Sequence, residues 1–167
     1  PLVGTGTNFS IVTTPVNDFI PAQVGNGLQV NAVGEYARLL QTDGTTKNVE
    51  LDKGTVDFWY KPNYAHTDGV RYALLSTGTW GTTGSLHLIK NSAANSNEFT
   101  VYTFTALGVF ISSGVSSVNY TFTPGQWVNI RVTWDFTVPV GTRNVHVYFN
   151  GAEATFISGF STGPILM

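Results

Sequence analysis

Two segments in the last third of the chain alternate apolar and polar side chains over a short distance. Their apolar residues stand at every second position: Val128, Ile130, Val132 and Trp134, then Val145, Val147 and Phe149. A period of two is typical of a strand that buries one face. Asn150-Gly151 ends the second segment, and both residues accept the positive φ of a type I′ turn. The pattern predicts two neighbouring antiparallel strands with these apolar residues in the core.

Turn-forming residues, mostly Gly, Pro, Asn and Asp, divide the remaining sequence into short runs rich in Val, Ile, Thr, Phe and Tyr. Strands are expected near 7–13, 27–31, 35–41, 54–61, 70–77, 84–90, 98–105, 107–112, 116–122, 126–135, 143–150 and 152–157. No window of twelve residues has a convincing helical period of apolar residues. Ten or more strands without crossover helices predict an all-β fold, a two-sheet antiparallel β-sandwich or jelly roll.

The composition excludes several classes of protein. A chain of 167 residues with 42% hydrophobic residues is long enough for one folded domain over 1–167. It begins Pro-Leu-Val without an initiator Met, so we expect a fragment of a longer protein. A net charge of −2 with eight scattered basic residues argues against nucleic acid as a partner. No run of eighteen apolar residues occurs, so membrane insertion is not expected. Without cysteine the chain has neither disulfides nor thiol chemistry.

Several motifs together resemble one family. The segments 126–135 and 145–151 resemble the "W-x-x-V-x-V-T-x-D … V-x-V-Y-x-N-G" signature of laminin G-like domains. The segment 54–62, Gly-Thr-Val-Asp-Phe-Trp-Tyr-Lys-Pro, is similar to the family's "F-T-I-S-F-W-V-K-P", and 24–30 resembles its early "G-x-G-x-A-L-x-F" strand. The resemblance implies a jelly roll of the concanavalin A-like lectin and glucanase superfamily. It implies no particular ligand, because this superfamily includes lectins, carbohydrate-binding modules, glycan-cleaving enzymes and adhesion domains.

Catalytic motifs are missing from the sequence. Glycan-cleaving members of the superfamily place two carboxylates on one strand, as in Glu-x-Asp-x-x-Glu, about 5 Å apart for a retaining mechanism. The chain has only four glutamates, Glu35, Glu50, Glu98 and Glu153. The segment most similar to that motif is Glu50-Leu51-Asp52, which lacks the second Glu. Neither Gly-x-Ser-x-Gly nor His-Glu-x-x-His occurs. We therefore expect no enzymatic activity and no catalytic residue.

Sugar binding needs flat aromatic faces flanked by hydrogen-bonding side chains. Trp80 lies among Gly and Thr residues that are too small to bury it, and a second turn-rich loop, 62–72, carries further aromatic and basic groups. The residues expected to form a carbohydrate site are Trp80, Tyr64, His66, Arg71 and Tyr72. The alternative for Trp80 is a lid over the end of a sheet. The alternative site is the sheet face that carries Trp59 and Trp127.

The resemblance also suggests a structural calcium ion, since many members of the superfamily hold one with loop carboxylates and carbonyls. The available loop acids are Asp43, Asp68 and Asp135, but turn chemistry explains Asp43-Gly44 and Asp68-Gly69, and no dense ligand spacing appears. No other cofactor is expected.

Three functions remain. The first is a non-catalytic carbohydrate-binding, lectin-like module of a larger extracellular or surface protein, with a glycan or polysaccharide as partner. The second is a structural or adhesive domain of a phage particle, filament or cell envelope, contacting neighbouring subunits. A glycan-cleaving enzyme is the least favoured.

Overall fold

The computed structural model of the chain describes residues 8–12, 19–30, 36–40, 52–82, 84–95, 98–104, 110–115, 121–139 and 142–158. Its contacts divide the chain into two compact units, Pro1–Glu50 and Leu51–Met167. The single domain over 1–167 stays a prediction. Strand pairs throughout the described ranges are antiparallel, and their only helical element is the short 3-10 turn η1 (Ala93–Asn95). The predicted all-β class is confirmed.

The first unit contains two pairs of strands. β1 (Asn8–Val12) pairs with β4 (Tyr36–Leu40), and β2 (Phe19–Pro21) pairs with β3 (Asn26–Leu28). Gly25, with a φ of 64°, makes the tight turn before β3, where its carbonyl accepts a hydrogen bond from the Ala22 N–H. β1, β3 and β4 lie where the sequence predicts strands, whereas β2 was not predicted.

The second unit contains a sheet of four strands in the order β12-β11-β10-β5. These are β5 (Lys53–Tyr60), β10 (Val128–Asp135), β11 (Val145–Phe149) and β12 (Ala152–Glu153). The central strand β10 alternates buried and accessible residues, as a strand with one buried face must. The register places Val132 opposite Val56 on one side and opposite Val147 on the other.

A second sheet has five strands in the order β13-β9-β8-β7-β6. They are β6 (Tyr72–Ser76), β7 (Leu86–Lys90), β8 (Phe99–Phe104), β9 (Phe110–Val115) and β13 (Phe156–Ser158). Every residue of β7 is buried, so both faces of this sheet are covered at its centre. The outer-face residues of β7 and β8 therefore belong to a second, smaller buried layer.

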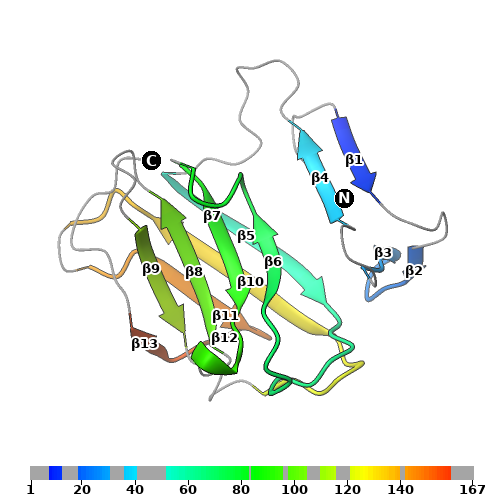
Figure 1. The fold of residues 1–167 in the computed structure, drawn as a ribbon. Coiled ribbons are helices and arrows are strands. Elements are labelled where there is room, and N and C mark those ends of the chain that lie inside the picture. Colours follow the sequence, from blue (N-terminus) through cyan, green and yellow to red (C-terminus); the bar gives the residue numbers. More distant parts are fainter. Residues whose placement is uncertain are drawn as a thin grey trace. The chain divides into compact units, whose positions relative to one another are not determined.

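The two sheets of this unit pack face to face around an apolar core. In Figure 1, β6 to β9 lie in front of β5, β10 and β11. The rings of Phe99 on β8 and Phe149 on β11 meet across the interface, with centroids 4.8 Å apart. The six residues that the sequence predicts for the core are each at most 3% exposed: Val128, Ile130, Val132, Val145, Val147 and Phe149. The predicted β-sandwich and its register are confirmed, since a slip of one residue would expose all six.

The Asn150-Gly151 turn has the predicted geometry. Both residues have positive φ, 50° and 83°, as a type I′ hairpin turn requires. The Asn150 side chain also accepts a hydrogen bond from the Asn129 N–H on β10, at 3.0 Å. The dipeptide thus closes the β11–β12 hairpin and ties it to the neighbouring strand.

Two strand predictions need correction. The run 152–157 forms two strands in different sheets, because Ala154, buried between them, leads the chain from one sheet to the other. The run 107–112 overlaps β9, which continues to Val115, and the run 116–122 contains no strand among its described residues. Within them, 107–109 and 116–120 lie outside the described residues, and Thr121 and Phe122 belong to no strand.

Candidate functional site

The loop that carries four of the five predicted sugar-binding residues runs from the end of β5 to the start of β6. Its anchor is Lys90, the last residue of β7, whose side chain is completely buried. The Lys90 ammonium donates to Asp68 Oδ1 at 2.6 Å and to the Val70 carbonyl at 3.0 Å. It also lies 5.7 Å and 5.6 Å from the ring centroids of Tyr64 and Tyr72. The buried ammonium of Lys90 thus holds the loop against β7.

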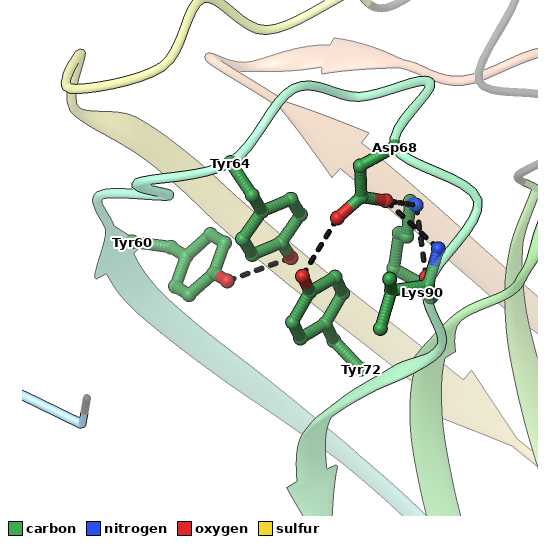
Figure 2. A network of polar contacts seen from close by, with 6 residues as sticks. Tyr60, Tyr64, Asp68, Tyr72 and Lys90 are labelled. Carbon is green, nitrogen blue, oxygen red and sulfur yellow. Dashed lines mark hydrogen bonds and ion pairs between the residues drawn. The ribbon is translucent and has the colours of Figure 1, made fainter. Parts of the chain in front are cut away.

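The tyrosines of this network stack and hydrogen-bond with each other (Figure 2). The rings of Tyr64 and Tyr72 are stacked at 3.7 Å with an angle of 10° between their planes. Tyr60 donates to the Tyr64 hydroxyl at 2.8 Å, and Tyr72 donates to Asp68 Oδ2 at 2.6 Å. Burial is the main cause that raises the pKa of Tyr64, and the hydrogen bond that Tyr72 donates to Asp68 raises the pKa of Tyr72 to about 12. Both tyrosines stay protonated at neutral pH.

The Asp68 carboxylate is fully engaged inside the same network. Burial alone would raise its pKa, but hydrogen bonds from Lys90, Tyr72 and the Val70 N–H outweigh burial and lower the pKa below its ordinary value. Asp68 is therefore ionised at neutral pH and serves as the counterion of Lys90. Its hydrogen bonds connect the loop to Lys90 on β7 and to Tyr72 on β6, and so hold the loop in place.

His66 lies on the inner side of the loop and is buried. Its ring meets the edge of Phe122 with centroids 5.2 Å apart and stacks near Phe99. Burial, together with the nearby charge of Lys90, lowers the pKa of His66, so that the imidazole is neutral at neutral pH. Tyr64, His66 and Tyr72 hence form the support of the loop in this structure, while Arg71 points to its exposed side.

Trp80 and Arg71 come together on the outer side of the five-stranded sheet. Trp80 is 47% exposed, and the Arg71 Cζ lies 4.7 Å from the centroid of its ring. The Arg71 Cζ is also 5.7 Å from the centroid of the Tyr102 ring, which meets the Trp80 ring in an edge-on contact with centroids 5.1 Å apart. Beneath them the indole rests against His87 and Phe104 at 5.1 Å and 5.2 Å. We name these residues the Trp80 cluster: Arg71, Trp80, His87, Tyr102 and Phe104.

Hydrogen bonds hold the base of the Trp80 cluster in place. His87 contacts the Ser76 hydroxyl through Nδ1 at 2.9 Å and the Ser85 hydroxyl through Nε2 at 3.0 Å. Ser85 donates onward to the Thr82 carbonyl in the Trp80 loop, at 2.8 Å. Burial, assisted by the positive charge of Arg71, lowers the pKa of His87. A neutral, doubly bonded imidazole therefore carries the exposed indole and keeps its position fixed.

A second exposed indole lies on the outer face of the four-stranded sheet. Trp59 is 44% exposed, and its indole has no ring contact or side-chain hydrogen bond with any described residue. Asn129 lies opposite it in the register. Asn129 donates to Asp57 Oδ1 at 2.6 Å, and Arg131 donates to Asp57 Oδ2 at 2.8 Å. The hydrogen bond from Asn129 is the main cause that lowers the pKa of Asp57.

One open depression lies at the far end of this outer face, with a volume of about 500 Å³. Thr55, Thr133 and His146 line it, in one row across β5, β10 and β11. Asn144 also lines it, but both polar atoms of its side chain are inaccessible to water, so a solute in the depression does not reach them. None of the residues predicted for the sugar site borders this depression.

The structure describes only some of the acids considered for catalysis or calcium. Glu153 pairs with Arg143 and His146, and Asp135 accepts hydrogen bonds from Thr137. Glu35, Glu50 and Asp43 lie outside the described residues. Across the ranges that the structure describes, no group of three or more His, Asp or Glu side chains is arranged to hold a metal ion.

The structure adds two residues to the predicted site that the sequence does not reveal, Tyr102 and Phe104. Both stand on β8 with Thr100 in ordinary strand alternation, and nothing in that pattern shows that they meet Trp80. The exposed position of Trp80, by contrast, follows from its small neighbours, as argued from the sequence.

Comparison with known proteins gives no family assignment: no family model matches the chain, and neither does any curated protein. Among the described residues there is also no helix long and apolar enough to span a membrane.

Proposed function

We propose that this chain is a non-catalytic carbohydrate-binding, lectin-like module of a larger extracellular or surface protein, with the Trp80 cluster as its binding site. The observation that carries this is the half-exposed indole of Trp80, joined by Arg71 and Tyr102 on a fixed base. An exposed aromatic residue beside a rigid hydrogen-bond donor is what sugar recognition needs, because pyranose rings present C–H surfaces next to hydroxyl groups.

The rigidity of the base favours binding at this place. His87, Ser76 and Ser85 hold the indole from below, and the Lys90 network holds the loop that ends in Arg71. Groups that are fixed before the ligand arrives lose little conformational entropy on binding. In this proposal Trp80 and Arg71 contact the glycan, while Tyr64, His66 and Tyr72 position the loop.

The experiment is a glycan array with the purified chain, followed by titration of each retained ligand. Trp80→Ala is compared with Trp59→Ala, a matched control because the two indoles are almost equally exposed, at 47% and 44%. Loss of an anchor aromatic residue weakens binding about ten- to a hundredfold. We expect that loss for Trp80→Ala alone, with a melting temperature close to that of the unchanged chain.

Other outcomes contradict the proposal in distinct ways. If Trp59→Ala abolishes binding and Trp80→Ala does not, the site is the outer face of the four-stranded sheet. If Trp80→Ala unfolds the chain, Trp80 is a lid over the sheet. If no glycan binds at all, the carbohydrate proposal fails, and the alternative of a structural or adhesive domain, contacting neighbouring subunits through exposed side chains such as Trp59, takes its place.

A further inference from the structure

Arg71 differs from the other arginines whose side chains the structure describes. Arg131 pairs with Asp57, and Arg143 pairs with Glu153. Arg71 is exposed, and within the described part of the chain it has no carboxylate partner. The nearest acid in its loop, Asp68, has its oxygens engaged by Lys90, by Tyr72 and by the Val70 N–H. An unpaired cation therefore stands at the centre of the proposed binding site.

The aromatic rings fix the position of this cation without using its hydrogen bonds. A guanidinium on an aromatic face is attracted through its flat side, so its N–H groups stay available in the plane of the group. The Arg71 Cζ lies within 6 Å of two ring centroids, those of Trp80 and Tyr102. Contacts with two rings favour this position of the Arg71 side chain before a ligand arrives, which reduces the side-chain entropy that remains to be lost on binding.

The position of the Arg71 guanidinium over the indole also limits what Trp80 can bind. Because Arg71 covers part of the indole ring, a neutral sugar cannot lie on that ring face without displacing a favourable cation–π contact. A ligand with a carboxylate gains instead, since carboxylate oxygens match the parallel N–H groups of arginine and form charge-assisted hydrogen bonds. The neutral state of His87, whose pKa is lowered, leaves Arg71 as the cation of the cluster.

We propose that the Trp80 cluster binds an acidic saccharide, with Arg71 holding the carboxylate of a uronic or sialic acid unit and the exposed part of Trp80 contacting its ring. This inference rests on the proposed function and names the ligand class of the same site. Arg71 would then be the residue that selects acidic over neutral sugars.

The test uses paired probes that differ only in charge. Oligosaccharides of glucuronate, galacturonate, mannuronate and sialic acid are each measured beside their carboxyl-reduced forms, in which the carboxylate is a CH₂OH group. The protein variants are Arg71→Ala, Arg71→Lys and the control Arg131→Ala, which removes an arginine that is also exposed but is paired with Asp57. Calorimetric titration at fixed salt gives the affinities, and melting temperatures verify folding.

We expect that at least one acidic probe binds. Its reduced form should bind at least about tenfold more weakly, because the charge-assisted hydrogen bond to the carboxylate is lost. Arg71→Ala should remove that preference, and Arg71→Lys should restore little of it, because an ammonium has no planar fork. Arg131→Ala should leave it unchanged. If Arg71→Ala fails to fold, Arg71→Lys and the probe pairs alone decide.

Four results would overturn the inference. If acidic and reduced probes bind equally, the site does not select for a carboxylate. If Arg71→Ala keeps the preference, a group other than Arg71 recognises the carboxylate. In both cases the proposed function survives without this role of Arg71. If Arg131→Ala weakens binding as much as Arg71→Ala, attraction is by general charge and Arg71 has no special role. If neither the probe pairs nor any neutral glycan binds, the proposed function itself fails.

Discussion

The buried pair of Lys90 and Asp68 allows a stability prediction whose sign depends on which partner is removed. The Lys90 ammonium is completely buried, and the Asp68 side chain is 18% exposed. Changing Asp68→Asn removes the carboxylate that the structure describes beside this buried charge, while the contacts of the ammonium with the Val70 carbonyl and with the rings of Tyr64 and Tyr72 remain. Breaking a buried pair in this way costs about 3–5 kcal/mol. Since Asp68 keeps partial contact with water, we expect the lower end, about 3 kcal/mol.

Removing the lysine should have a far smaller effect. Lys90→Met leaves an apolar side chain of similar length against the faces of Tyr64 and Tyr72, and Asp68 retains its bonds from Tyr72 and the Val70 N–H. Replacing a buried charge by a well-packed apolar residue is often neutral, so we expect a change of less than about 1 kcal/mol. The double variant should recover most of the stability that Asp68→Asn loses.

The assay is urea unfolding at pH 7, followed by tryptophan fluorescence, for both single variants and the double variant. Asp57→Asn, on the exposed pair with Arg131, is the control and should cost at most about 1 kcal/mol. If Lys90→Met destabilises as much as Asp68→Asn and the two effects add, Lys90 is not a charge that Asp68 compensates, and the description of the network is wrong.

The same pair predicts a dependence on pH. The pKa of Asp68 in the folded chain is lowered, so its contribution to stability is present above the ordinary carboxyl pKa of about 4 and is lost as the pH falls through the lowered value. The difference in unfolding free energy between the unchanged chain and Asp68→Asn should thus be constant above about pH 5 and shrink towards pH 2. A difference that grows on acidification would refute this assignment.

Three further predictions concern the sandwich. Gly54→Val should destabilise by about 1–3 kcal/mol, because even the Cβ would lie 2.6 Å from Trp134 Cζ2; unchanged urea unfolding would contradict that packing. Asn150→Ala should lower the free energy of unfolding by about 1–2 kcal/mol, because alanine disfavours the positive φ at this position and cannot accept the hydrogen bond from the Asn129 N–H. Asn150→Gly should lower it less, since glycine tolerates the positive φ, and a comparison of melting temperatures tests this order. Ile130→Ala should cost about 2–5 kcal/mol in the same unfolding assay, and a value below 1 would place Ile130 outside the core.

The central hairpin could be predicted from the sequence because its determinants are local. Alternation in 128–134 and 145–149 specifies which face is buried, and Asn150-Gly151 specifies the turn that follows. Local patterns fail where the chain changes sheets. Ala152 to Ser158 keeps a strand-like composition throughout, and only the packing of Ala154 decides that its two halves belong to different sheets.

The candidate site could be predicted only in part, because its contacts join residues far apart in the sequence. The small neighbours of Trp80 indicate its exposure, but its contacts with Arg71 and Tyr102 depend on how β6, β7 and β8 align. Lys90 shows a second limit. Its alternation with Leu86 and Leu88 places it on the core face, whereas the general preference of lysine for the surface argues the opposite. The counterion Asp68, 22 residues earlier, resolves that conflict.

The most direct measurement of the central claim is the chemical shift of the four tryptophan indole N–H groups during titration with a glycan that the array retains. Each signal is assigned by replacing one tryptophan at a time with phenylalanine. We predict a saturable shift of the Trp80 signal, while the signals of Trp59, Trp127 and Trp134 stay in place. A saturable shift of Trp59 with Trp80 unchanged, or no shift in any of the four, would contradict the account.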